Sequence, residues 1–208
     1  MKTWRRSLLL LTATSALLLT GCTGGGSSAR SKLEAAQSVY RTMSGCTAQA
    51  EITADYGQRV YGYTVDLTVK GGSGVMTVKE PENLAGTVLT WSDGETQLAF
   101  DGTELDTGTL SDNGLSPADA MPTILTACQG GEIVDCCMEE QEGGQVLHGT
   151  LDLDGDQGGQ IQCWFQPDSY GLLRAELSQD GVTVVTMQFS DFSFTFPEGG
   201  VEDSGGSQ

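Results

Sequence analysis

The sequence predicts a mainly β (α+β) fold, in which a strongly curved antiparallel sheet of about 11 strands covers an N-terminal helix and a mid-chain helix. Short runs of alternating apolar and polar residues, typical of strands with one buried face, fill most of the chain. Turn residues separate these runs about every 8–12 residues, which is the spacing of antiparallel hairpins. Only two stretches show the spacing of an amphipathic helix. A long sheet with one apolar face buries that face by curving over the helices.

The first helix is expected to begin at Lys32, with Ser31 as its N-cap, and to end before Gly45. Its apolar stripe recurs every three or four residues: Leu33, Ala36, Val39, Tyr40 and Met43.

The second helix is expected to start at Ser116-Pro117, because serine is a favoured N-cap and proline suits the first helical position. Gly130-Gly131 is expected to end it. Pro122 lacks an amide hydrogen, so we expect it to bend or break this helix. The apolar stripe comprises Ala118, Met121, Ile124, Leu125 and Cys128.

Strands are expected on both sides of the second helix. Before it, the alternation is clearest in Tyr61–Lys70, and Asp101-Gly102 is a dipeptide that favours hairpin turns. The strands expected there are 48–54, 61–70, 75–79, 86–91, 96–100 and 103–107. Those expected after it are 132–138, 146–153, 159–165, 172–178, 182–189 and 191–196.

The pairing of strands 146–153 and 159–165 can be predicted residue by residue. A loop at 155–157 places Leu147 opposite Phe165, and Leu151 opposite Ile161, in one apolar layer. His148, the only histidine, then lies on the outer face opposite Trp164.

The N-terminus reads as an export signal. Basic residues precede the apolar run Leu8–Leu19, and the sequence Leu19-Thr20-Gly21-Cys22 stands at the end of this run. These four residues resemble the lipobox of bacterial lipoproteins, in which the cysteine is lipidated and becomes the first mature residue. The run of a dozen residues is too short for a membrane span, which needs about 20. We therefore expect lipidation of Cys22, for example with palmitate, and a location on the extracytoplasmic face of the cell membrane.

Four segments follow from these patterns. Residues 1–21 are the expected signal peptide, and 22–31 form a Gly/Ser-rich tether. Residues 32–197 are expected to form a single β domain. The acidic, Gly/Ser-rich residues 198–208 are expected to be disordered.

The chain is strongly acidic. Residues 22–208 contain seven basic and 28 acidic side chains, a net charge of about −21. Nucleic-acid binding depends on lysine and arginine, so a nucleic-acid partner is not expected. The same charge opposes close docking on anionic lipid, and the lipid anchor would hold the domain at the membrane.

Five cysteines remain if Cys22 carries lipid, so they cannot all be paired within one chain. One or two disulfides are possible in an oxidising compartment, and buried free thiols are equally compatible with the sequence. The pairing is open for Cys46, Cys128, Cys136, Cys137 and Cys163.

Neither a metal nor a cofactor is expected. Asp152, Asp154 and Asp156 look like the start of a calcium loop, but Gln157 and Cys163 stand where an EF-hand needs glycine and glutamate. The sequence has no nucleophile elbow, P-loop or dinucleotide-binding fingerprint. Because the lone histidine is expected on the outer face, we do not expect catalytic residues.

The inner faces of the early strands provide the candidate binding residues. Two arrangements remain open: the helices fill the concave side as a core, or they leave a cavity for an apolar ligand. The residues expected to line the concave side are Tyr63, Val65, Leu67, Val69, Met76, Val78, Leu89, Trp91, Leu98 and Phe100.

The lipobox, the leading helix ending in methionine, the Ser92-Asp93-Gly94 and Asp101-Gly102 turns and the Ser116-Pro117 helix start together resemble the LolA/LolB-like lipoprotein superfamily. Within it, the pattern is nearest to Gram-positive membrane lipoproteins such as the germination lipoprotein GerS. The resemblance covers roughly residues 32–197 and implies an unclosed β half-barrel.

Carrier members of this superfamily receive the acyl chains of lipids or lipoproteins, whereas GerS-like members bind a cell-wall enzyme. We therefore expect a non-enzymatic, membrane-anchored binding protein with a protein partner in envelope or cell-wall processes. The alternatives are an acyl-chain carrier that uses a concave cavity and an extracellular hydrolase.

Overall fold

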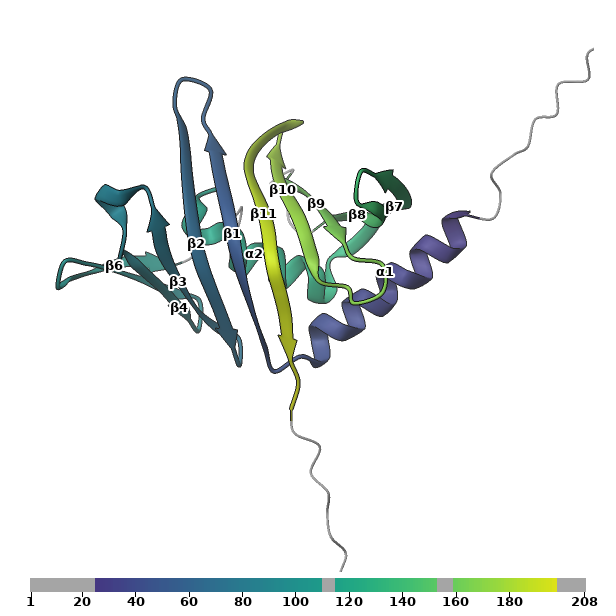
Figure 1. Ribbon diagram of the computed structural model, residues 1–208, viewed down its shortest axis with the longest axis horizontal. Coiled ribbons are helices and arrows are strands. Elements are labelled where there is room, and N and C mark those ends of the chain that lie inside the picture. Colours follow the sequence, from purple (N-terminus) through teal and green to yellow (C-terminus); the bar gives the residue numbers. More distant parts are fainter. Residues whose placement is uncertain (1–24, 110–114, 153–158, 198–208) are drawn as a thin grey trace, which may run out of the picture.

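One antiparallel sheet of 11 strands makes up most of the computed structural model, which describes residues 25–109, 115–152 and 159–197 (Figure 1). The strand order is β6-β5-β4-β3-β2-β1-β11-β10-β9-β8-β7. The two edge strands, β6 and β7, pair on one side only within the described part of the chain, so the sheet is unclosed. The predicted fold class, a curved antiparallel sheet with two helices, is confirmed.

The first half of the chain places its strands in sequence order along one side of the sheet. Its elements are α1 (Gly25–Thr42), β1 (Gly45–Asp55), β2 (Val60–Lys70), β3 (Ser73–Glu80), η1 (Glu82–Leu84), β4 (Val88–Ser92), β5 (Glu95–Phe100) and β6 (Thr103–Thr109). The second half forms the other side of the sheet, and its last strand pairs with β1. Its elements are α2 (Pro117–Gly130), β7 (Glu132–Gln141), β8 (Gly144–Asp152), β9 (Gly159–Phe165), β10 (Leu172–Gln179) and β11 (Val182–Thr195).

Helix α1 begins earlier than predicted. It starts at Gly25 rather than Lys32, and so includes residues that the sequence analysis assigns to a flexible tether. Ala29 is fully buried one turn before Leu33, so the apolar face of the helix extends into the Gly/Ser-rich segment. Packing against the sheet therefore outweighs the low helix propensity of glycine and serine there.

Two further expectations about element boundaries are corrected. Helix α2 runs through Pro122 without a break, although its N-cap at Ser116 and its end at Gly130 are as predicted. Met121 and Ile124 on either side of the proline are fully buried, and this packing holds the helix together. The expected strands 182–189 and 191–196 are one strand, β11, because the residues near Asp191 form a bulge against β1 instead of a turn.

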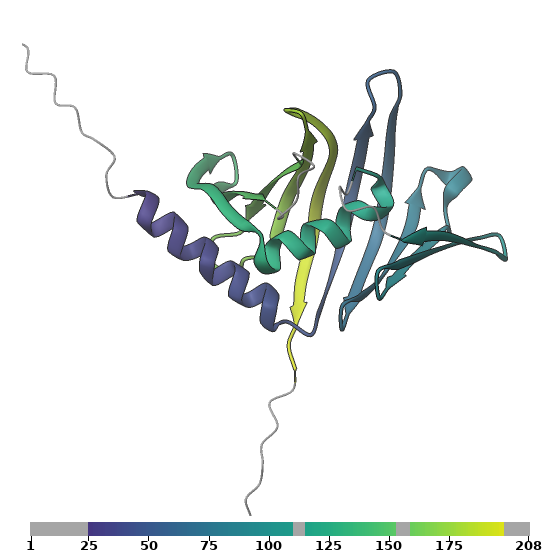
Figure 2. The ribbon, with the colours of Figure 1, turned by 180° about the vertical axis from the view of Figure 1, so that it is seen from behind.

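Both helices lie on the same face of the sheet (Figure 2). Helix α1 packs over β7 and β8, and α2 lies between α1 and the middle of the sheet, in contact with β1 and β8. Gly149 allows α1 to lie close to β8, because a Cβ atom at this position would be only 2.6 Å from Leu33 Cδ2 of the helix. No helix in the described ranges is long and apolar enough to cross a membrane.

The hydrophobic core lies between the two helices and the sheet, and β1–β4 contribute buried residues to it as well as β7–β11. Tyr40 of α1 is fully buried, and its ring makes edge-to-face contacts with Phe165 and Phe194. Its hydroxyl donates a hydrogen bond to the Tyr170 carbonyl over 3.1 Å. The fixed position of α1 therefore leaves the inner face of β2–β5 to be covered by other elements.

Candidate functional site

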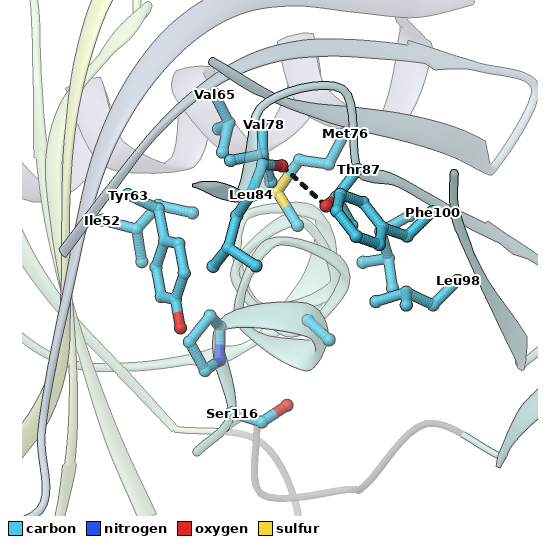
Figure 3. Close-up of a pocket in the computed structure, with 13 residues that line it drawn as sticks. Ile52, Tyr63, Val65, Met76, Val78, Leu84, Thr87, Leu98, Phe100 and Ser116 are labelled. Carbon is cyan, nitrogen blue, oxygen red and sulfur yellow. Dashed lines mark hydrogen bonds between the residues drawn. The ribbon is translucent and has the colours of Figure 1, made fainter. Parts of the chain in front are cut away.

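A pocket of about 360 Å³ lies on the inner face of β2–β5, beside η1 and the first turn of α2. This volume is at the lower end of the range for small-molecule sites, roughly 300–1,000 Å³. Figure 3 shows the apolar side chains that surround it. Its lining consists of Ile52, Tyr63, Val65, Met76, Val78, Leu84, Thr87, Leu89, Leu98, Phe100, Ser116, Pro117 and Ala118.

The strand register creates the main wall of the pocket. Met76 pairs with Leu89, and Leu89 pairs with Leu98, which forms a row of apolar side chains across β3, β4 and β5. Val65 pairs with Val78 in a parallel row one step away. Because side chains alternate between the faces of a strand, all five point to the concave side.

A short connection over β3 and β4 supplies the second wall. The Thr87 hydroxyl donates a hydrogen bond of 2.6 Å to the Leu84 carbonyl, which is the dashed line in Figure 3. The amide of Leu84 in turn donates to the Pro81 carbonyl over 2.9 Å. These bonds hold Leu84 of η1 against the pocket.

The start of α2 supplies the third wall. The Asp119 amide donates to the Ser116 hydroxyl oxygen over 3.1 Å, and that hydroxyl donates to the Asp119 carboxylate over 2.7 Å. This capping geometry fixes the first turn and directs Pro117 and Ala118 into the lining. The Tyr56 hydroxyl donates to the Leu115 carbonyl over 3.0 Å, which ties the β1–β2 hairpin to this wall.

Apolar groups dominate the lining. None of its residues is a lysine, arginine, histidine, cysteine, aspartate or glutamate. The hydroxyls of Thr87 and Ser116 are already engaged by Leu84 and Asp119, and Figure 3 shows the Tyr63 hydroxyl directed toward the Ser116 end of the pocket. The pocket is therefore suited to an apolar group and offers few hydrogen bonds to orient it.

The Tyr56 phenol outside the lining keeps its proton at neutral pH. Burial raises its pKa, and the neighbouring Tyr63, Tyr61 and Asp119 raise it further. The protonated phenol is the donor that its hydrogen bond to Leu115 requires.

The residues expected on the concave side are divided among three places. Leu67 is buried in the core, and Val69 and Trp91 line a second pocket of about 280 Å³ next to the last turns of α2. The first pocket contains the other seven: Tyr63, Val65, Met76, Val78, Leu89, Leu98 and Phe100.

The sequence analysis missed the residues that other elements contribute to the pocket. Ser116 and Pro117 carry a clear helix-start signal but no signal of proximity to β2–β5. Leu84 lies in a connection without periodicity. The sequence left open whether the helices fill the concave side as a core or leave a cavity. The helices fill it over β7–β11, and a pocket remains over β2–β5.

The only histidine lies far along the sheet from this pocket, on β8. The predicted register is confirmed: Leu147 pairs with Phe165, and His148 with Trp164. The buried Cys163 pairs with Gly149 and not with the histidine. On the other neighbouring strand, however, Cys137 pairs with His148, a contact that the sequence analysis did not consider.

The described cysteines form no disulfide. Cys46, Cys128 and Cys163 are buried, and the Sγ atoms of Cys128 and Cys163 are 3.9 Å apart. Burial raises the pKa of the Cys128 thiol well above its ordinary value, and its neighbour Cys163 adds to the effect. Cys22, Asp154, Asp156 and the tail 198–208 lie outside the described residues.

Neither a known protein family nor a curated protein matches the sequence. Among solved structures, the chain is similar to a LolA superfamily protein from Nitrosomonas europaea, with 10% identity over 82% of this chain and 94% of the other, at a TM-score of 0.42. It is similar to the lipoprotein LppX from Mycobacterium tuberculosis, with 12% identity over 83% and 97% of the two chains, at a TM-score of 0.48.

A third similar chain comes from the complex of the CwlD amidase with the GerS lipoprotein from Clostridioides difficile. The identity is 14%, the match covers 89% of this chain and 99% of the other, and the TM-score is 0.38. The structural neighbours thus include the superfamily that the sequence resembles.

Proposed function

We propose that this chain is a non-enzymatic, membrane-anchored binding protein on the extracytoplasmic face, whose pocket receives an apolar group of a protein partner. The observation that carries the proposal is the apolar pocket over β2–β5, whose walls are the inner face of the strands, η1 and the start of α2. The anchor is Cys22, for which the support is the Leu19-Thr20-Gly21-Cys22 sequence.

The surroundings of the pocket favour a protein partner. Phe100 lines the pocket and is 41% exposed, and Leu105 on the neighbouring strand β6 is 59% exposed. Tyr56 and Tyr61 are exposed on the β1–β2 hairpin, and their rings are in edge-to-face contact. Exposed apolar side chains gathered beside a pocket are typical of protein–protein contact sites.

The charge of the chain favours a basic partner. Residues 22–208 carry a net charge of about −21, so anionic lipid surfaces are repelled and a positively charged protein is attracted. Charge of this kind mainly accelerates association and selects among partners. The apolar pocket would then supply most of the affinity.

A short connection to the anchor favours a stationary protein. Only Thr23 and Gly24 separate Cys22 from the first residue of α1. A lipid on Cys22 would therefore hold the domain close to the membrane surface and would not let it travel across a wide gap. This argues against shuttling of a cargo.

An acyl chain of a lipid is the second candidate ligand. The size and the apolar lining of the pocket favour it, because both suit a hydrocarbon chain. A hydrolase is the least supported function, since the pocket lining contains no histidine, aspartate, glutamate, lysine or cysteine to act as general acid or base.

Site-specific photo-crosslinking in cells tests the proposal and separates the two ligands. A benzoylphenylalanine at Phe100 would lie at the pocket, whereas one at Val75 would lie on the opposite face of the sheet with a similar exposure, 41% against 39%. We expect a discrete protein adduct from position 100 and none from position 75. A lipid-sized mass increase at position 100 would identify an acyl chain, and not a protein, as the ligand. Equal adducts at both positions would contradict a function centred on the pocket.

A further inference from the structure

Three metal-ligating side chains converge on the outer face of the sheet, on strands β7 and β8. They are the Cys137 thiol, the Glu139 carboxylate and the His148 imidazole, whose ligand atoms all lie within 4.8 Å of one another. The Cys137 Sγ is 3.9 Å from His148 Nδ1 and 3.7 Å from Glu139 Oε1. The cluster lies near the β7 edge of the sheet, beyond the half that carries the pocket.

The strand register sets this arrangement. Cys137 and His148 are direct partners across the β7–β8 pair. Glu139 lies two residues after Cys137 and therefore on the same face of β7. The three side chains belong to two paired strands, which are more rigid supports for a site than loops.

Neighbouring groups hold the histidine in a metal-binding orientation. His148 Nε2 is 3.1 Å from the Gln162 side-chain oxygen, which can only accept a hydrogen bond. Nδ1 faces Cys137 and Glu139, and its 2.6 Å contact with Glu139 Oε1 is a hydrogen bond that Nδ1 donates. This proton must leave before Nδ1 can bind a metal. The Trp164 ring stacks on the imidazole, with centroids 4.4 Å apart and planes 5° apart.

The same tryptophan also orients the carboxylate. Trp164 Nε1 donates a hydrogen bond of 3.0 Å to Glu139 Oε2, so that Oε1 faces the other two ligands. Arg174 covers the outer side of the indole, 5.3 Å from its centroid. Outer groups of this kind are typical of built metal sites, in which they fix the ligands.

We propose that Cys137, Glu139 and His148 bind a thiophilic divalent transition metal, zinc foremost, with a fourth coordination position left open to solvent. One sulfur, one imidazole nitrogen and one carboxylate oxygen form a donor set that suits zinc. On binding, the Cys137 thiol and Nδ1 of His148 each release a proton to solvent, and sulfur–metal and nitrogen–metal bonds form in their place.

The distances fit this proposal with a small adjustment. Ligands about 2.0–2.3 Å from a tetrahedral zinc ion lie roughly 3–4 Å from one another. The two distances from the sulfur already fall in this range, at 3.9 and 3.7 Å. The 2.6 Å contact between His148 Nδ1 and Glu139 Oε1 would have to widen through a small rotation of the half-buried Glu139 side chain.

Two other roles of the cluster make different predictions. His148 and Glu139 could serve only as a surface ion pair, in which case Cys137 would be a bystander. Cys137, which is exposed, could also be only a reactive thiol. A metal site requires all three side chains together, and neither of the other roles does.

Titration of the reduced full-length protein with Co²⁺, followed by displacement with Zn²⁺, tests the site. We expect one Co²⁺ per chain, with a sulfur-to-cobalt charge-transfer band and visible bands of tetrahedral cobalt, all abolished by one equivalent of Zn²⁺. Cys137→Ser should remove the charge-transfer band and weaken binding at least tenfold. The neighbouring Cys136→Ser is the matched control, because Cys136 lies on the opposite face of β7 and its loss should change nothing.

A second variant and a second readout keep the test independent of folding. Gln162→Leu leaves all three ligands in place, and loss of an outer hydrogen bond to a ligating histidine typically lowers affinity 10- to 100-fold. Zn²⁺ should also slow modification of Cys137 by a thiol reagent in the wild type and leave Cys136 unaffected. Binding that survives Cys137→Ser unchanged, or a Co²⁺ spectrum without the sulfur band, would overturn the proposal.

Discussion

The Tyr56 hydroxyl and the Leu115 carbonyl, 59 residues apart in the sequence, are joined by a hydrogen bond of 3.0 Å. This bond connects the β1–β2 hairpin with the residue before the N-cap of α2. Ser116, Pro117 and Ala118 directly after it form one wall of the apolar pocket. The position of that wall therefore depends on a contact between distant segments.

Tyr56→Phe should loosen this wall without unfolding the protein. The phenylalanine keeps the edge-to-face contact with Tyr61 and loses only the hydrogen bond, which is worth about 0.5–1.5 kcal/mol. Amide hydrogen exchange at the start of α2 should become faster, whereas exchange in β9 and β10 should not change. Unchanged exchange near Ser116 would show that the bond does not hold the wall.

Ser116→Ala should lower the free energy of unfolding by about 1 kcal/mol, because the Asp119 amide loses its capping acceptor. Ser116→Thr retains a hydroxyl at the same position and serves as the control. Urea unfolding of both variants measures the difference. Equal stability of the two variants would contradict a capping role for the hydroxyl.

Gly74→Ala should be strongly destabilising. A Cβ at Gly74 would lie 1.9 Å from Cζ2 of the buried Trp91, its partner on β4. The overpacking should cost about 1–3 kcal/mol. Gly62→Ala is the matched control, because no atom lies within 4 Å of its added Cβ, and it should be neutral or stabilising by up to about 1 kcal/mol. Thermal unfolding midpoints of the two variants measure the difference in stability. Equal midpoints would contradict the packing of Trp91 on β3.

Alkaline pH should destabilise the fold through Cys46. Burial raises the pKa of this thiol from 9.0 to about 11, so the folded state retains a proton that the unfolded state has lost. The contribution of Cys46 to the free energy of unfolding is complete below pH 9. It declines as the pH rises to about 11, by at most about 1.4 kcal/mol per pH unit. Cys46→Ala should show a shallower decline between these pH values in urea unfolding, and an equal slope would assign the alkaline loss to other groups.

Much of the fold could be predicted from local pattern. The pairing of Leu147 with Phe165 follows from strict alternation on two strands, which allows only one register with both apolar faces inside. The N-cap at Ser116 follows equally well, because serine before proline is a strong local signal.

The features that were missed depend on contacts between elements. Residues 25–31 read as a tether by composition, but Ala29 packs against the sheet and the helix extends to it. The pocket needs Leu84 and Ala118 beside β2–β5, and no local pattern places them there. The contact of Cys137 with His148 is predictable in principle, because a turn at Glu142-Gly143 sets the register of β7 and β8.

Binding of a neutral apolar probe to the pocket tests the central claim most directly. Fluorescence titration with N-phenyl-1-naphthylamine can compare the wild type with Ala118→Phe, which places a ring in the pocket, and with Ala99→Phe, which makes the same change on the opposite face of β5 beside Leu98. The account predicts saturable binding by the wild type and Ala99→Phe, and at least a tenfold loss of affinity in Ala118→Phe. Equal binding by all three proteins would contradict a ligand-accepting pocket at this site.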